Sequence, residues 1–268
     1  PTASSNSPVC EGQSVSFFGD NTASGQTTGN SYLWGGPNGF NDIVKNPILS
    51  NATAAANGTY TVTVTNQFGC SLTATTPVTV APPPALNIQS QTNVSCNGGG
   101  DGAFTIEVTN GFGFYLYDQN GNINFDGMFS GFSAGLYIVQ VTDGNSCASS
   151  IPVTITEPDP TTIPDAGQDQ TLCVGATVTL AGNAAAVGTG TWTVVTGSGT
   201  FTNANDPATT VTGVGAGLNT YAWTIDNALC FISNSDNVDV TTTVLPTATV
   251  SGTTSICNGQ SSNLTLDF

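Results

Sequence analysis

Apolar and polar residues alternate along much of the chain, in short runs separated by Gly, Pro, Asn and Ser. Clear examples are TYTVTVT at 59–65, LYIVQVT at 136–142 and TYAWTID at 220–226. A period of two places successive side chains on opposite faces of a β-strand, so each run predicts a half-buried strand. No convincing run has the 3.6-residue period of an amphipathic helix. The pattern therefore predicts an all-β fold built from short strands and turns.

The same strand pattern recurs about every 80 residues, each time between two cysteines. Each copy begins with a Cys-x-Gly motif, and we call its cysteine the opening cysteine: Cys10, Cys96, Cys173 and Cys257. Each complete copy ends with a cysteine after a Tyr-containing strand, and we call it the closing cysteine: Cys70, Cys147 and Cys230. Similarity at a fixed spacing is the signature of an internal repeat.

Prolines gather after the last strand of each copy, for example in PVTVAPPPA at 77–85 and PVTITEPDP at 152–160. Proline restricts the backbone and favours an extended, semi-rigid joint. We therefore predict an extended array of tandem β-sandwich modules. Their predicted bounds are 1–82, 83–158 and 159–244, with the start of a further module at 245–268.

The size of each module suggests a role for the cysteines. A module of some 80 residues has a small hydrophobic core, which only narrowly offsets the conformational entropy lost on folding. We predict one disulfide in each complete module, and the predicted pairs are Cys10–Cys70, Cys96–Cys147 and Cys173–Cys230. In the loop-entropy description each contributes up to about 4 kcal/mol. Cys257 is then left unpaired within this sequence, its partner expected beyond residue 268; the alternative is a free or intermolecular thiol.

Composition excludes several classes of function. Lys45 is the only basic residue, Arg and His are absent, and the formal net charge is −16, so nucleic acids and anionic membrane surfaces are poor partners. Without His, neither a Ser-His-Asp nor a Cys-His arrangement can form, and the cysteines lack the Cys-x2-Cys or His spacing of a zinc site. No apolar run approaches the roughly 20 residues of a membrane helix. Disulfides would place the protein outside the reducing cytosol.

Several segments resemble modules of one class of protein. PVCEGQSVSF with YLWGGPNGF (8–17 and 32–40) resembles the immunoglobulin-like modules of very large surface proteins of Bacteroidota. VSCNGGGDGAFTI through SAGLYIVQVTDGNSC (94–147) resembles the repeat named after the gliding adhesin SprB, although Gln119 stands where such repeats often carry Trp. PDAGQDQTLCVGATVTLAGN (164–183) resembles their PKD-like modules, and the segment from 246 resembles the start of another.

The resemblance implies a non-catalytic segment of a long stalk on the cell surface, with adhesion and gliding as functions and type IX secretion as the export route. Its partners would be neighbouring modules of the same longer chain, extracellular polysaccharide, or the cell-surface and secretion machinery. The alternative is polysaccharide-binding or spacer modules of a secreted multidomain protein. No enzymatic activity is expected, and Ca²⁺ is the only cofactor for which the sequence offers candidate ligands.

Two groups of residues are candidate binding sites. Tyr115 and Tyr117 lie in an aromatic segment at 111–132 and, if exposed, could stack on sugar rings; the alternative is that they pack in the core. Four carboxylates surround the second proline-rich joint and could hold Ca²⁺ through their oxygens: Glu157, Asp159, Asp165 and Asp169. The alternative for these four is a solvated acidic linker.

Overall fold

Antiparallel strands dominate the protein, as the alternation predicts. The computed structural model describes residues 1–21, 29–252, 255–261, 263 and 265–267. Strands account for 50% and helix for 2%, so the all-β prediction is confirmed. The chain forms two compact units, Pro1–Val94 with Gly98–Glu157, and Ser95–Asn97 with Pro158–Phe268.

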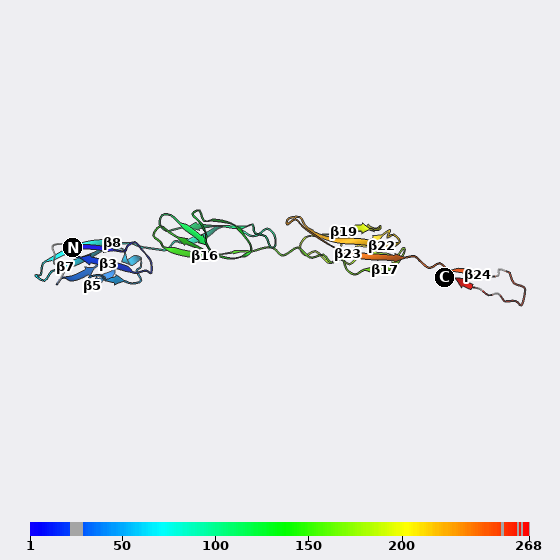
Figure 1. The fold of residues 1–268 in the computed structure, drawn as a ribbon, viewed down its shortest axis with the longest axis horizontal. Helices are drawn as coiled ribbons and strands as arrows, with labels where there is room; N and C mark the ends of the chain where they lie inside the picture. The colour runs from blue at the N-terminus through cyan, green and yellow to red at the C-terminus, as the bar shows by residue number, and fades with distance from the viewer. Residues whose placement is uncertain (22–28, 253–254, 262, 264, 268) are drawn as a thin grey trace. The chain divides into compact units, whose positions relative to one another are not determined.

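Sandwich 1 (residues 1–81) belongs to the first unit (Figure 1). Its elements are β1 (Thr2–Ser5), β2 (Val9–Cys10), β3 (Val15–Asp20), β4 (Ser31–Gly35), β5 (Asn41–Asp42), β6 (Ile48–Leu49), β7 (Gly58–Thr65), β8 (Ser71–Val78) and β9 (Val80–Ala81), with the 3₁₀ turns η1 (Pro37–Gly39) and η2 (Ala54–Ala56). One sheet has the order β1-β3-β6 and the other β5-β4-β7-β8, while β2 pairs in parallel with β9.

The core of sandwich 1 lies between these two sheets. Phe17 of β3 packs against Trp34 of β4 and Tyr60 of β7, with ring centroids 5.2 and 4.6 Å away. All three side chains are fully buried, as are Val15 and Val62. The predicted alternation of β7 thus places every second residue, from Tyr60 onward, in the core.

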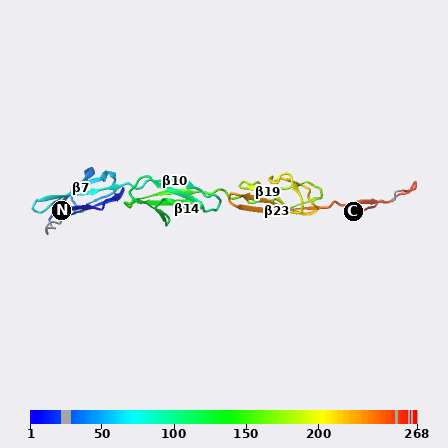
Figure 2. The same ribbon diagram turned by 90° about the horizontal axis from the view of Figure 1, so that it is seen from above.

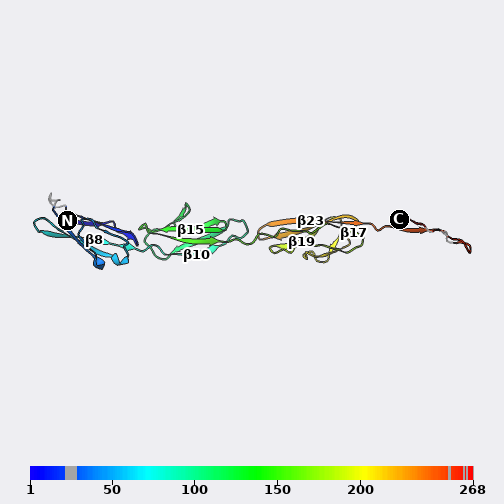
Figure 3. The same ribbon diagram turned by 90° about the horizontal axis from the view of Figure 1, so that it is seen from below.

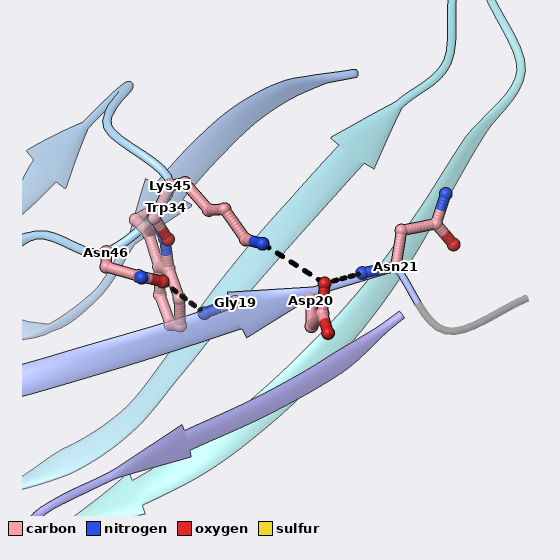
Figure 4. A network of polar contacts seen from close by, with 6 residues as sticks. All are labelled: Gly19, Asp20, Asn21, Trp34, Lys45 and Asn46. Atoms are coloured by element: carbon pink, nitrogen blue, oxygen red, sulfur yellow. Dashed lines mark hydrogen bonds and ion pairs between the residues drawn. The ribbon is translucent and has the colours of Figure 1, made fainter. Parts of the chain in front are cut away.

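The single lysine of the protein lies at the edge of this core (Figure 4). The Lys45 ammonium is 3.2 Å from an Asp20 carboxylate oxygen, and this hydrogen bond holds the pKa of Asp20 below its usual value. The Lys45 carbonyl accepts a hydrogen bond from the Trp34 indole at 3.2 Å. The Gly19 N–H donates to the Asn46 side-chain oxygen, also at 3.2 Å. Because the ion pair is exposed, its contribution to stability is small.

Sandwich 2 (residues 85–156) has the same two-layer build. Its strands are β10 (Leu86–Thr92), β11 (Gly102–Val108), β12 (Leu116–Gln119), β13 (Asn122–Asn124), β14 (Met128–Phe132), β15 (Gly135–Thr142) and β16 (Ala148–Ile155). The sheets have the orders β10-β11-β14 and β13-β12-β15-β16. Figure 2 labels β10 and β14 of the first sheet, and Figure 3 labels β15 of the second. Phe104 and Ile106 from the first sheet meet Val139 and Val141 from the second in the core.

Sandwich 3 (residues 161–243) belongs to the second unit. Its strands are β17 (Gln170–Cys173), β18 (Val178–Thr179), β19 (Thr189–Thr196), β20 (Thr200–Phe201), β21 (Thr210–Thr212), β22 (Gly217–Asn227) and β23 (Ile232–Thr243), followed by the pair β24 (Thr249–Ser251) and β25 (Thr265–Asp267). The sheets have the orders β17-β23-β22-β19 and β18-β21-β20. Trp192 and Trp223 lie directly opposite each other on β19 and β22 and fill the core, their ring centroids 5.0 Å apart.

The three sandwiches have separate cores. Each large cluster of buried apolar side chains contains residues of one sandwich only. Since no side chain is shared between these clusters, each sandwich has its own source of stability. The boundaries predicted at 82, 158 and 244 stay a prediction.

Three tyrosines have structural roles. The Tyr60 hydroxyl donates to the Ala56 carbonyl at 3.0 Å, and the Tyr137 hydroxyl donates to the Ser133 carbonyl at 2.8 Å. Both bonds reach back four residues, as in the tyrosine corner of immunoglobulin folds. The Tyr221 hydroxyl donates to Ser198 instead. Burial raises the pKa of the Tyr60 and Tyr221 phenols.

Candidate functional site: cysteines at the module ends

The opening cysteines lie beside the C-terminal end of the last strand of their own sandwich. Cys10 ends β2 and is opposite Ala81 in the parallel β2–β9 pair. Cys173 ends β17 and is opposite Thr243, the last residue of β23. After each cysteine the chain turns in the same way, because the N–H three residues later donates to the cysteine carbonyl, at 3.0 and 3.1 Å. Cys10 and Cys173 therefore occupy equivalent positions.

The opening cysteine of sandwich 2 has a corresponding place. The Val94 N–H donates to the Thr156 carbonyl at 3.0 Å, immediately after β16. Cys96 follows two residues later, and the Asn97 side chain donates to the Pro158 carbonyl at 3.1 Å. Residues 95–97 belong to the second compact unit, together with the chain from Pro158 onward.

The closing cysteines lie at the opposite end of the last long strand, in the turn that precedes it. Cys70 directly precedes β8, and Cys147 directly precedes β16. Both turns are held by the side chain four residues earlier. The Asn66 side-chain oxygen accepts the Cys70 N–H, and an Asp143 carboxylate oxygen accepts the Cys147 N–H, each at 3.0 Å. Cys230 lies in the turn between β22 and β23.

This geometry rules out the predicted disulfides within the modules. The opening and closing cysteines of one sandwich are separated by the length of its last strand, about 30 Å for ten extended residues. A disulfide needs Cα atoms within about 7 Å. The predicted pairs Cys10–Cys70, Cys96–Cys147 and Cys173–Cys230 are therefore wrong, although four of these six cysteines are bonded.

The disulfides instead join the opening cysteine of one sandwich to the closing cysteine of the next. Cys10 is bonded to Cys147, with Cα atoms 5.4 Å apart. Cys96 is bonded to Cys230, with Cα atoms 5.6 Å apart. Cys70, Cys173 and Cys257 are free and exposed. Cys70 and Cys173 were thus wrongly assigned to disulfides, and the expectation that Cys257 pairs beyond residue 268 stays a prediction.

The Cys10–Cys147 bond is sheltered inside the first unit. Cys147 is fully buried, and both cysteines form a small cluster with Ala81. The buried Asp143 carboxylate shapes the turn that presents Cys147, since it accepts hydrogen bonds from the N–H groups of Phe112, Asn145 and Cys147 at 3.2, 2.9 and 3.0 Å. Three N–H donors satisfy this carboxylate without any cation.

The sequence contained a signal for this pairing. Every opening cysteine follows the first strand of its module, and every closing cysteine precedes the last strand. If the first and last strands run side by side in parallel, the two cysteines must lie at opposite ends of the module. In the structure, β2 pairs in parallel with β9, and β17 pairs in parallel with β23. The alternation of apolar and polar residues predicts the strands but not this parallel pairing.

The structure does not support Tyr115 and Tyr117 as a pair of exposed sugar-stacking residues. Tyr117 is only 6% exposed and belongs to the core of sandwich 2, and Tyr115 is half-buried against the same core. Burial raises the pKa of the Tyr117 phenol. The alternating residues Phe114 and Leu116 point the other way, and Phe114 is 89% exposed. The alternative, that both tyrosines pack in the core, is correct. At this point of the chain the odd-numbered side chains face the core.

The four acidic residues of the second joint have separate surroundings. Among the residues that the structure describes, no group of three His, Cys, Asp or Glu side chains could hold a metal ion. Glu157 accepts the Gly98 N–H, and Asp165 accepts the Gly167 N–H at 2.9 Å. Asp169 accepts the Asp239 N–H, also at 2.9 Å, and Asp159 is exposed. Three of the four carboxylates thus bond backbone N–H groups, and the Ca²⁺ site stays a prediction.

The pairing predicts which thiols react in the native protein. Cys70, Cys173 and Cys257 should be alkylated by a maleimide without denaturant, because all three are exposed and free. Cys10, Cys96, Cys147 and Cys230 should react only after reduction. Mass spectrometry of peptides from the unreduced protein would check this, and alkylation at Cys10 with protection at Cys70 would contradict it.

A second prediction concerns the turn that presents Cys147. Asp143→Ala removes three hydrogen bonds to a carboxylate, each of the class worth about 1.5–3 kcal/mol. The fraction of protein with an intact Cys10–Cys147 bond in a glutathione buffer should fall, with at least a tenfold change in the exchange equilibrium. Asn66→Ala, in the equivalent turn before the free Cys70, is the matched control and should leave this equilibrium unchanged. Equal effects of the two substitutions would show that the Asp143 turn has no special role.

Comparison with known proteins gives one family match. Residues 88–124, within sandwich 2, match the model of the SprB repeat. No curated protein sequence matches the chain. Among the described residues, no helix has the length and apolar character needed to cross a membrane.

Similar solved structures include three tandem-domain proteins. The three N-terminal domains of the bacteriophage RB49 highly immunogenic outer capsid protein are 11% identical, with 91% of this chain and 99% of that chain covered and a TM-score of 0.36. Sidekick-1 immunoglobulin domains 1–4 are 12% identical, with 88% and 73% covered and a TM-score of 0.30. The eight N-terminal immunoglobulin domains of Down syndrome cell adhesion molecule are 15% identical, with 94% and 35% covered and a TM-score of 0.29.

Proposed function

We propose that this chain is a non-catalytic structural and adhesive segment of a large cell-surface protein. The observation that carries the proposal is the pair of disulfides between successive sandwiches, Cys10–Cys147 and Cys96–Cys230. Such bonds make a covalent series of modules, which suits a stalk that transmits force. The SprB-repeat match at 88–124 supports the same interpretation, because it lies within sandwich 2 and includes Cys96, one of the bonded cysteines.

The finer parts of the proposal are a Bacteroidota source, PKD-like modules in sandwich 3, gliding or surface attachment as the task, and export by type IX secretion. Disulfides support a place outside the cytosol. The partners are then neighbouring modules of a longer chain, with extracellular polysaccharide or the cell-surface and secretion machinery as further partners. Because His is absent from the whole sequence, no Ser-His-Asp or Cys-His arrangement can form, and this supports a non-catalytic role.

The free cysteines suggest how the same arrangement would extend. Cys70 has the turn of a bonded closing cysteine, and Cys173 has the parallel-strand position of the bonded Cys10. By the same rule, Cys70 would pair with an opening cysteine of a preceding module, and Cys173 with a closing cysteine of a following one.

Antibody labelling of intact cells tests the proposal. Antibodies raised against residues 1–268 should label the surface of unpermeabilised cells, and deletion of these modules in frame should reduce attachment or gliding. Labelling only after permeabilisation would overturn the surface assignment. Normal attachment and gliding of the deletion strain would overturn the adhesive role.

The alternative function is a polysaccharide-binding or spacer module, and one observation favours a modified form of it. Phe112 and Phe114 are 64% and 89% exposed in the loop before β12. If sandwich 2 binds sugar rings by stacking, these phenylalanines would serve in place of the buried Tyr117. Binding to insoluble polysaccharide should then be lost in Phe114→Ser. It should be kept in Leu136→Ser, the control, which replaces another exposed apolar side chain, on β15. This pair of results would support the alternative.

A further inference from the structure

The two disulfides interlock along the sequence. Cys10–Cys147 closes one loop and Cys96–Cys230 closes another, and each loop contains one cysteine of the other bond. The segment between Cys96 and Cys147 belongs to both loops. A chain with this connectivity cannot be drawn out along its full length, whatever happens to its folded modules.

We propose that these bonds route tension through sandwich 2 and keep it off most of sandwiches 1 and 3, namely residues 11–95 and 148–229. Force applied at residue 1 reaches Cys10 and passes through sulfur to Cys147. Force applied at residue 268 reaches Cys230 and passes through sulfur to Cys96. Three backbone arms connect the two disulfides: Cys147 to Cys96, Cys10 to Cys96, and Cys147 to Cys230. The arm that carries the tension is the one that becomes fully extended first.

The lengths of the loop arms identify this segment. The direct arm between Cys147 and Cys96 has 51 peptide steps, whereas the arm from Cys10 to Cys96 has 86 and the arm from Cys147 to Cys230 has 83. The shortest arm becomes taut first, and the longer arms stay slack. Residues 97–146, most of sandwich 2, therefore carry the tension, while residues 11–95 and 148–229 do not.

The folded structure fits this division. Cys147 and Cys96 flank opposite ends of β16, so tension acts along the length of sandwich 2, where β16 is paired with β15 over eight residues. In sandwich 1, only β1 and β2 precede Cys10 and can be pulled away. Trp34, Phe17 and Tyr60 all lie in a slack arm. In sandwich 3, β23 follows Cys230 and lies in the tension path with its core residues Val238 and Val240. Trp192 and Trp223 lie in the other slack arm.

The path also sets a limit on extension. It has nine steps to Cys10, 51 from Cys147 to Cys96 and 38 from Cys230 to residue 268, against 267 steps for the reduced chain. At about 3.5 Å per step, the oxidised chain should extend to about 350 Å and the reduced chain to about 930 Å. The tension path follows from the disulfide pairing alone. Only its biological purpose rests on the proposed stalk function.

Single-molecule pulling of the whole 268-residue chain between handles at its ends tests the path. The oxidised protein should stop at about 350 Å, and removal of Cys10–Cys147 by Cys10→Ser with Cys147→Ser should raise the limit to about 470 Å. Removal of Cys96–Cys230 by the corresponding pair of serines should give about 460 Å.

Cys70→Ser is the decisive control. Pairing within modules would also give a limit near 350 Å, but Cys70→Ser would then lengthen the chain by about 200 Å, whereas the pairing between modules predicts an unchanged limit. Trp34→Ala in the slack arm should leave the oxidised unfolding forces unchanged, and Phe104→Ala in sandwich 2 should lower them. A longer Cys70→Ser chain, or equal effects of the two core variants, would overturn the proposal. The pulling experiment does not depend on surface labelling or attachment. Its result therefore tests the tension path separately from the proposed stalk function.

Discussion

Trp223→Ala should unfold sandwich 3 and leave sandwiches 1 and 2 folded. The Trp223 side chain is 1% exposed, packs against Trp192, and donates its indole N–H to the Asn183 carbonyl at 3.1 Å. Truncating a buried Trp to Ala costs about 3–5 kcal/mol. A domain of about 80 residues has a total stability of only about 4–12 kcal/mol. The loss is therefore comparable to the whole stability of the module.

Calorimetry of the full chain would measure this effect. The transition of sandwich 3 should fall by about 12–40 °C or disappear, because 1 kcal/mol corresponds to about 4–8 °C in a small domain. The other transitions should keep their midpoints, since the cores share no residues. Val195→Ala, on β19 at a side chain 52% exposed, is the control and should shift the midpoint by only a few degrees. A parallel fall of all transitions would mean that the sandwiches unfold as one unit.

Asn219→Ala should destabilise sandwich 3 almost as strongly as Trp223→Ala. Asn219 is 1% exposed on β22. Its amide donates to the carbonyls of Gly215, Gly217 and Val240 at 2.9, 3.2 and 3.4 Å, and its oxygen accepts the Ser198 N–H at 3.0 Å. Alanine would remove all four hydrogen bonds, including the one to the carbonyl of the fully buried Val240, while the Thr242 hydroxyl would still donate to the Gly215 and Gly217 carbonyls. Each buried group left unsatisfied costs about 1–3 kcal/mol, so a total loss of about 2–4 kcal/mol is expected.

Asn205→Ala provides the matched comparison. Asn205 is exposed, and its amide donates to the Gly190 carbonyl and the Thr191 hydroxyl, both at 2.9 Å. Water can replace the lost donor at an exposed site, so a loss below about 1 kcal/mol is expected. Urea unfolding of both variants would give the two values. If they were equal, burial of the Asn219 amide would not be the source of its contribution.

The strands of the cores were largely predictable from the sequence. Tyr60, Val62 and Val64 alternate with threonines, and this period is enough to place them inside a sheet. The same holds for Val139 and Val141 on β15. Alternation does not say which of two apolar sets faces inward when both are aromatic or aliphatic, as at residues 114–117. There the packing of Tyr117 against the core of sandwich 2 decided the matter.

The sequence by itself determined an all-β chain of repeated modules, the places of the cysteines at strand ends, and the absence of histidine. These properties depend on local periodicity, spacing and inventory, which need no knowledge of long-range contacts. Only the tertiary structure decided which cysteines are bonded, because a disulfide depends on the distance between two Cα atoms. The parallel pairing of first and last strands places Cys10 and Cys70 at opposite ends of one sandwich, and it leaves Cys10 beside Cys147 of the next.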